Sequence, residues 1–116
     1  LFALSVHGTP AASQSSATAL RFARAALAAG HGVHRVFFFH DGVESANALA
    51  VPPPDAPATL AGWIDLAETA GVELTVCISA GLRRGIVDAD ARARHGLDGT
   101  SLHPAFAIAG LGQLVE

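Results

Sequence analysis

The sequence is short of cysteine, lysine, methionine and tyrosine. Its 116 residues include one cysteine, Cys77, and no methionine or tyrosine, and all seven basic side chains are arginines. A single cysteine excludes a disulfide bond within this chain and a metal site made of several of its thiols. Because a free thiol is typical of a reducing compartment, we expect a cytoplasmic protein.

Positive charge is also scarce. The net charge is −3, and the arginines are scattered along the chain, whereas a surface that binds nucleic acid shows a basic patch. We therefore expect no direct contact with nucleic acid. The apolar runs are far shorter than the roughly 20 residues that span a membrane. The first residues carry no basic segment ahead of an apolar one, so we also expect no secretory signal.

Apolar side chains, by contrast, are abundant. Hydrophobic residues make up 51% of the sequence and charged residues 15%. This composition and the length predict a single domain over residues 1–116 with a substantial core. It also predicts that part of the apolar surface contacts another subunit.

Segments typical of strands and of helices alternate along the chain. The β-prone apolar runs are residues 1–6, 33–39, 72–77 and 104–109. The helix-prone segments are residues 13–29, 58–70 and 87–96. Asp88 opens the last of these as a cap, and Gly96 closes it. The alternation predicts an α/β domain with an open, mainly parallel sheet and helices on both faces. Such a sheet usually has one more strand, which we expect beyond residue 116.

The segments between these elements are predicted from their turn residues. Residues 40–42, His-Asp-Gly, are expected to form a turn, because Asp-Gly tolerates a positive φ, and residues 43–49 one or two helical turns. The prolines of residues 51–57 exclude regular structure and predict a surface loop. In the segment 58–70 the helical spacing predicts these buried side chains: Leu60, Trp63, Ile64, Ala67 and Ala70.

Cys77 ends the third predicted strand, ahead of a Ser-Ala-Gly turn and of Arg83 and Arg84. Free cysteine is among the most buried residue types, so one interpretation is a small packed hydrophobe. The other is a thiolate nucleophile at the carboxyl end of a parallel strand, where ligands collect. A helix dipole and the two arginines would then favour the thiolate. Composition and spacing alone favour the packed residue.

Hydroxyl side chains gather before the first predicted helix. They are Thr9, Ser13, Ser15 and Ser16. Hydroxyls at a helix start can hold a phosphate, and the stretch loosely resembles the phosphate loop of flavodoxins. Helix capping is the simpler explanation, and no cofactor is predicted.

Six histidines raise the question of a metal site. Their one close pair, His31 and His34, has no carboxylate at a metal-binding interval, so no metal site is predicted. His7 and His40 both follow strands and are expected on the same rim as Cys77. Either could act there as a proton donor or as a partner of the thiolate.

Several segments carry a resemblance to a known family. They are VFFFHDGV at residues 36–43, VCISA at 76–80, LRRGIVD at 82–88, the helix at 13–30 and the closing stretch GLGQLVE. Over essentially the whole chain, the sequence resembles the DsrE/TusD family of small intracellular sulfur-transfer proteins. The cysteine followed by Arg-Arg-Gly, two hydrophobic residues and Asp is the most specific part.

The resemblance implies a function for Cys77. It implies that Cys77 accepts sulfane sulfur as a persulfide from an upstream donor and passes it to a downstream partner's cysteine, in a heterohexamer with two related small subunits. It implies a sheet of about five strands, with a final helix and strand beyond this sequence. His40, Arg83 and Arg84 match the family pattern, and we expect supporting roles for them.

Two branches of the family are open alternatives for the pathway. The relay feeds either 2-thiouridine formation at the wobble base of tRNA, which we favour as the more widespread role, or dissimilatory sulfur oxidation. Two alternatives lie outside the relay. One is a flavodoxin-like module that binds a phosphate-bearing cofactor, and the other is a scaffold subunit with an inert Cys77.

Overall fold

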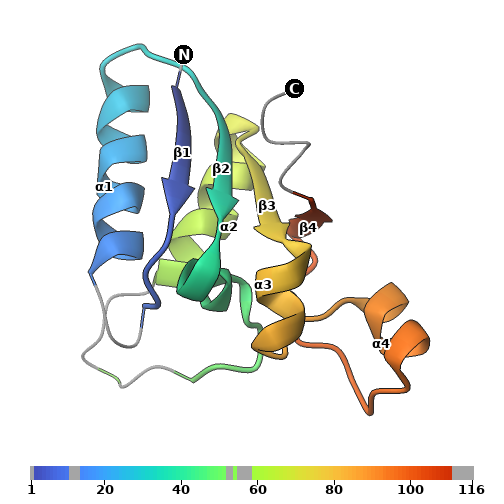
Figure 1. Cartoon of the computed structure of the whole chain (residues 1–116). Helices are drawn as coiled ribbons and strands as arrows, with labels where there is room; N and C mark the ends of the chain where they lie inside the picture. The colour runs from blue at the N-terminus through green and yellow to red at the C-terminus, as the bar shows by residue number, and fades with distance from the viewer. Residues whose placement is uncertain (1, 11–13, 52–53, 55–58, 111–116) are drawn as a thin grey trace.

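The computed structural model describes residues 2–10, 14–51, 54 and 59–110, and its strands form one open sheet. The sheet has the order β1-β2-β3-β4, and all neighbouring strands are parallel. The strands are β1 (Phe2–Val6), β2 (Val33–Phe38), β3 (Glu73–Cys77) and β4 (Phe106–Ala109). Their carboxyl ends therefore meet at one edge (Figure 1). The predicted α/β class with an open parallel sheet is confirmed.

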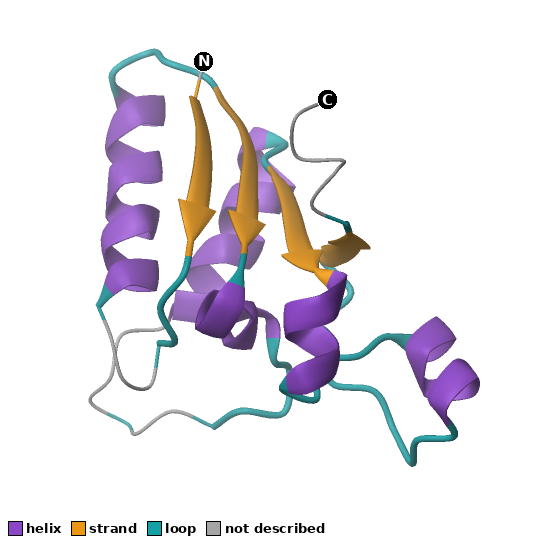
Figure 2. Ribbon diagram, in the orientation of Figure 1, coloured by secondary structure: helices purple, strands orange, loops and turns teal. Residues whose placement is uncertain are grey.

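The helices are α1 (Ser15–Ala28), the 3-10 helix η1 (His40–Ala46), α2 (Thr59–Ala70), α3 (Ile78–Arg83) and α4 (Ala89–His95). The helices α1 and α2 pack against this sheet, η1 and α3 follow β2 and β3 at its carboxyl edge, and α4 lies apart from it with no buried residue (Figure 1). Figure 2 shows α2 behind the sheet and α3 at the carboxyl end of β3. Trp63 of α2 packs edge-on against Phe38 of β2, with ring centroids 5.3 Å apart. The core therefore lies between the sheet and the helix pair α1 and α2.

The strands form where β-branched and aromatic residues follow one another. Val36 lies opposite Leu74, and Phe38 lies opposite Val76. All four side chains are buried, and each contributes roughly 1.5–3 kcal/mol relative to an exposed side chain. Because side chains alternate between the two faces of a strand, the register brings these residues to one face.

A buried polar cluster joins three helices behind the sheet. The indole Nε1 of Trp63 donates a hydrogen bond of 3.0 Å to Oγ of Ser16. The hydroxyl of Ser16 lies 2.9 Å from that of Ser45 in η1. Trp63 is fully buried, as its spacing predicted. Ser16 is therefore a core residue that fixes α1, α2 and η1 relative to one another.

The buried face of α2 differs from the predicted one. Ala70 is exposed, so its predicted burial is wrong. The buried residues of this helix are Thr59, Gly62, Trp63 and Leu66. A Cβ at position 62 would collide with the side chain of Leu20 in α1. The glycine thus allows a close contact between the two helices, and the face of α2 that carries Gly62 and Leu66 is the buried one.

The segment after β2 also departs from the prediction. The helix η1 begins at His40 instead of residue 43, and it ends at Ala46. The positive φ of this segment, 49°, belongs to His40 and not to the Asp-Gly pair. Asn47, predicted to be helical, instead forms an antiparallel bridge with Leu102. The predicted loop at 51–57 lies largely outside the described residues, and the closing stretch 111–116 lies wholly outside them.

Candidate active site

The candidate site lies along the carboxyl edge of the sheet. Val6 lies opposite Phe38, which in turn lies opposite Val76. The neighbouring strands therefore end side by side, and His7, His40 and Cys77 follow or close them in strand order (Figure 1). The structure thus places all three residues on one rim, as the sequence predicted.

Cys77 is the residue at which β3 becomes α3. It lies opposite Ala109 of β4, and it has the extended backbone of a helix N-cap, with φ of −62° and ψ of 124°. Its thiol is free, and the residue is 3% exposed. The helix start brings the positive end of the α3 dipole to the thiol. The same residue is packed in the core, so each of the two interpretations describes part of its environment.

The turn predicted after Cys77 is wrong, because α3 begins at Ile78. The residues Ile78–Arg83 are compatible with a helix, and the close packing depends on Gly81. A Cβ at position 81 would lie 2.8 Å from the carbonyl oxygen of Ile86. The amide of Ile86 donates to the carbonyl of Gly81 at 2.8 Å, and this bond closes the end of the short helix.

Arg83 and Arg84 lie at the far end of α3 from Cys77. Arg84 follows the last helical residue, and at 1.5 Å per residue this end lies roughly 10 Å along the axis from Cys77. The guanidinium of Arg84 donates from Nε to Oδ1 of Asp41 at 2.8 Å, and from Nη1 to the carbonyl of Ala80 at 3.1 Å. Arg84 thus joins α3 to η1, and support of Cys77 by either arginine stays a prediction.

His7 and His40 form a pair of rings on the same rim. Their ring centroids are 5.4 Å apart, and His40 also lies 4.1 Å from the ring of Phe39. Nε2 of His7 lies 2.8 Å from the hydroxyl of Ser5. The left-handed backbone of His40 costs about 1–2 kcal/mol, and backbone of this kind concentrates at functional sites. The role of these rings at Cys77 stays a prediction.

The sequence does not reveal that Asp41 forms an ion pair with Arg84. In the sequence, Asp-Gly indicates only a turn, and Arg84 is 43 residues away. In the structure, Asp41 and Gly42 make contacts with distant segments. Gly42 lies against the carbonyl of Val6, where a Cβ has no room, and Asp41 binds Arg84. No local pattern reveals an ion pair between two such distant segments.

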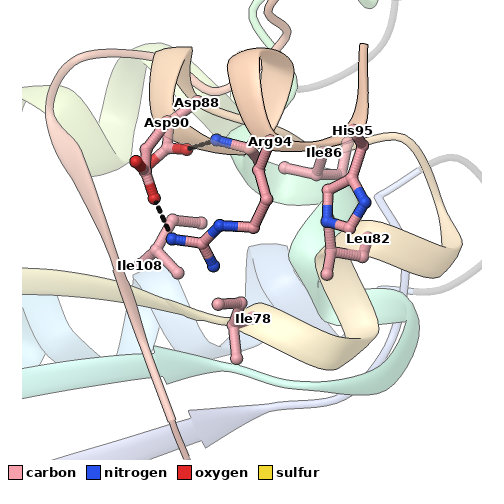
Figure 3. A pocket seen from close by; sticks show the side chains of 9 residues that line it. Ile78, Leu82, Ile86, Asp88, Asp90, Arg94, His95 and Ile108 are labelled. Atoms are coloured by element: carbon pink, nitrogen blue, oxygen red, sulfur yellow. Dashed lines mark hydrogen bonds and ion pairs between the residues drawn. The ribbon is translucent and has the colours of Figure 1, made fainter. Parts of the chain in front are cut away.

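A hollow of about 240 Å³ lies between α3 and α4 (Figure 3). Its apolar lining comes from Ile78, Leu82, Ile86 and Ile108. Its polar lining includes Asp90 and Arg94, and Arg94 donates to Asp90 at 2.8 Å. Cys77 is not among the described residues that line the hollow. Ile78 and Leu82 are nevertheless 38% and 39% exposed, so apolar surface lies open on the helix that begins at Cys77.

The serines before and at the start of α1, for which helix capping was the favoured interpretation and phosphate binding the alternative, have partners inside the protein. Oγ of Ser15 accepts from the amide of Gly8 at 3.0 Å. Ser16 belongs to the buried cluster with Trp63 and Ser45. Ser13 lies outside the described residues. Neither described serine caps α1, so the capping interpretation is wrong for them: the cap residue is Gln14, which makes no side-chain capping bond, and the two serines instead bind Gly8 and the buried cluster.

Among the residues that the structure describes, no three His, Cys, Asp or Glu side chains come together as metal ligands would. His31 and His34 are exposed, and the ring of His31 packs 5.7 Å from that of Phe2. In the same part of the chain, no helix combines the length and the apolarity needed to cross a membrane.

The parallel sheet and the cysteine at a helix start define a small α/β thiol protein. Residues 2–116 match the model of the DsrE/DsrF-like family, and the chain belongs to that family. A relative from Allochromatium vinosum that carries the name sulfurtransferase DsrE is 47% identical, over 99% of this chain and 88% of that protein. The sulfurtransferase TusD of Serratia proteamaculans is 42% identical, over 99% of this chain and 89% of that protein.

A solved structure supports the fold separately. The ychN protein from E. coli superposes with a TM-score of 0.69 at 19% identity, over 97% of this chain and 86% of that chain. The family resemblance, the fold and the class of activity predicted from the sequence are confirmed. The chain is a sulfurtransferase of the DsrE-like type.

Proposed function

We propose that this chain carries sulfane sulfur as a persulfide on Cys77 and passes it to a cysteine of a partner protein. The pathway we propose is the formation of 2-thiouridine at the wobble base of tRNA. One observation carries the proposal: the single cysteine of a DsrE-like chain stands where β3 meets α3, at the carboxyl edge of the sheet.

The chemistry requires two thiol–persulfide exchanges and no external oxidant. The Cys77 thiolate attacks the outer sulfur of a donor persulfide, an S–S bond forms at Cys77, and the donor leaves as a thiolate. A partner thiolate then attacks the outer sulfur of the Cys77 persulfide and releases Cys77 as a thiolate. The second thiol belongs to another chain, because this chain has one cysteine.

Two features of the environment of Cys77 act on the charged forms of this cycle in opposite directions. Burial of the residue opposes a charge, whereas its place at the start of α3 puts a persulfide anion at the positive end of the helix dipole. His40 and His7 stand on the same rim, and we propose His40 as a supporting proton donor to a departing thiolate. Arg83 and Arg84 support Cys77 through the helix that they close.

Exposed apolar residues support the proposal that the chain works within an assembly. Ile78 and Leu82 lie exposed on α3, and Leu49 and Val51 are exposed after η1. We propose that the chain is one subunit type of a heterohexamer with two related small subunits, and that it meets its donor and acceptor proteins in the cytoplasm. Apolar surface of this kind is typical of interaction sites.

The same relay in dissimilatory sulfur oxidation is the alternative pathway. The relatives named DsrE and TusD are similar to this chain to nearly the same degree, with 47% and 42% identity to it. The tRNA pathway is proposed because it is the more widespread of the two roles.

The two pathways can be distinguished by an exchange of Cys77 in the organism that encodes this chain. Exchange of Cys77→Ser is expected to remove 2-thiouridine from the wobble base, measured by mass spectrometry of digested tRNA. Ser79→Ala, an exposed site in the first turn of α3, is the matched control and is expected to retain the modification. Loss of sulfur oxidation with intact 2-thiouridine would establish the alternative. If both processes continue at their normal rates in the Cys77→Ser strain, the proposed relay is wrong.

A further inference from the structure

Cys77 is too deeply buried in this structure for its thiol to reach the sulfur of another protein. The residue is 3% exposed, yet sulfur exchange requires the attacking sulfur to touch the sulfur that it attacks. Cys77 is the residue that joins β3 to α3, so a shift of the first turn of α3 moves the backbone directly beside its side chain. The rate of exchange then depends on what holds that turn in place.

We propose that the ion pair between Asp41 and Arg84 holds α3 against η1 and thereby controls access to Cys77. The inference rests on the proposed function only for the need to uncover the thiol. Asp41 and Arg84 are positioning residues, since they act on Cys77 through the helix that begins there.

The contacts of Arg84 connect η1 to the first turn of α3. Nε of Arg84 donates to Oδ1 of Asp41 at 2.8 Å, and Nη1 donates to the carbonyl of Ala80 at 3.1 Å. Ala80 is the third residue of α3 and is buried. A single guanidinium thus hydrogen-bonds both to the first turn of α3 and to the neighbouring helix η1.

The segment that carries Asp41 is held rigidly in place. The next residue, Gly42, lies directly against the carbonyl of Val6, and its amide donates to the carbonyl of Phe39 at 2.9 Å. The position of Asp41 is therefore fixed by Val6 at the end of β1 and by Phe39, the residue after β2. Movement at the ion pair falls on α3 and not on η1.

The helix α3 itself has few means of holding its first turn. It is six residues long, and Cys77 makes no side-chain capping bond. Ile78 and Ser79 in the first turn are exposed. A helix of this length has little stability of its own, so its attachment to η1 decides how often it opens.

The strength of the pair sets the size of the expected effect. The side chains of Arg84 and Asp41 are 27% and 59% exposed, so the pair has the modest strength of exposed ion pairs. Its loss is expected to raise the open fraction, and with it the rate of Cys77 modification, by about 1.5- to 5-fold. Salt should produce the same change, because the Debye length falls to about 3 Å at 1 M.

The test measures the rate at which Cys77 of the full, assembled chain reacts with a chromogenic aromatic disulfide. Asp41→Asn is expected to react about 1.5- to 5-fold faster than wild type at low salt. In 1 M salt the wild-type rate is expected to rise to that of the variant, which itself changes little. The matched control is Asp90→Asn, which removes another ion pair of 2.8 Å, to Arg94 on α4. It is expected to leave the Cys77 rate unchanged.

A second variant tests whether the charge pair itself controls the rate. The double exchange Asp41→Arg with Arg84→Asp restores an ion pair of opposite polarity but not the bond of Arg84 to the carbonyl of Ala80. It is therefore expected to react more slowly than Arg84→Asp alone, and equal rates in these two variants would overturn the proposal. The proposal is overturned by an unchanged rate in Asp41→Asn. It is also overturned by an equal rise in Asp90→Asn, or by a wild-type rate that does not respond to salt. The assay needs no persulfide, so failure of the relay itself would leave these outcomes readable.

Discussion

Gly42 in η1 lies so close to the carbonyl of Val6 at the end of β1 that no side chain fits between them. The contact presses η1 onto the carboxyl edge of the sheet. It explains a glycine whose own φ is not positive. It also fixes the two residues before Gly42: His40, which follows β2 on the same rim as Cys77, and Asp41, which binds Arg84 at the far end of α3.

Exchange of Gly42→Ala is expected to lower the free energy of unfolding by about 1–3 kcal/mol, because the added methyl group meets rigid backbone. The measurement is urea denaturation followed by tryptophan fluorescence of Trp63. The control is Gly99→Ala, where a Cβ meets nothing within 4 Å, with an expected change within about 0.5 kcal/mol. Equal losses in the two variants would contradict the close contact.

Exchange of Ser16→Ala is expected to destabilise the protein by about 1–3 kcal/mol, since it leaves the buried indole N–H of Trp63 without its acceptor. The free energy of unfolding from chemical denaturation gives the result. Ser79→Ala, at an exposed position, serves as the control with little expected change. A stability of Ser16→Ala equal to that of Ser79→Ala would show that the hydrogen bond of Ser16 contributes nothing.

The backbone of His40 can be tested separately from its ring. His40→Gly is expected to be more stable than His40→Ala by about 1 kcal/mol, because glycine adopts a positive φ without the steric cost that alanine has. Both variants lack the imidazole, so the difference in their thermal unfolding reports the backbone alone. The reverse order of stability would contradict the left-handed conformation of His40.

The cap of α4 is expected to have a local effect. Asp88 accepts a hydrogen bond of 2.9 Å from the amide of Ala91, and α4 buries none of its residues. Asp88→Ala should speed amide exchange in the helix about 2- to 30-fold, the equivalent of a lost N-cap. Global unfolding should stay unchanged. Asp90→Ala removes only an exposed pair and is expected to have a smaller effect, so parallel losses of global stability in both variants would contradict this account.

The local signals in the sequence predicted the elements well. Asp88 and Gly96 delimit α4 because a capping carboxylate and a left-handed glycine act within one turn of the helix. The helical period alone predicts that Trp63 lies in the core. The strands are predictable because β-branched and aromatic residues favour extended backbone.

The relationships between distant segments could not be predicted. Ser16, at the start of a helix, has the pattern of a cap, and its burial depends on Trp63, 47 residues away. Gly62 turns α2 because Leu20 of another helix lies against it. Asp41 binds Arg84 only because η1 and α3 lie side by side. Each of these contacts is a property of the packing, and no local pattern carries it.

The proposed function requires Cys77 to carry sulfur, and intact-mass spectrometry tests this most directly. The assembled protein is incubated with a low-molecular-weight persulfide donor, beside the Cys77→Ser variant. We predict a mass gain of one or more sulfur atoms in wild type, which disappears on reduction and is absent from the variant. A folded, assembled wild-type protein that gains no sulfur would contradict the account and would leave Cys77 as a packed core residue.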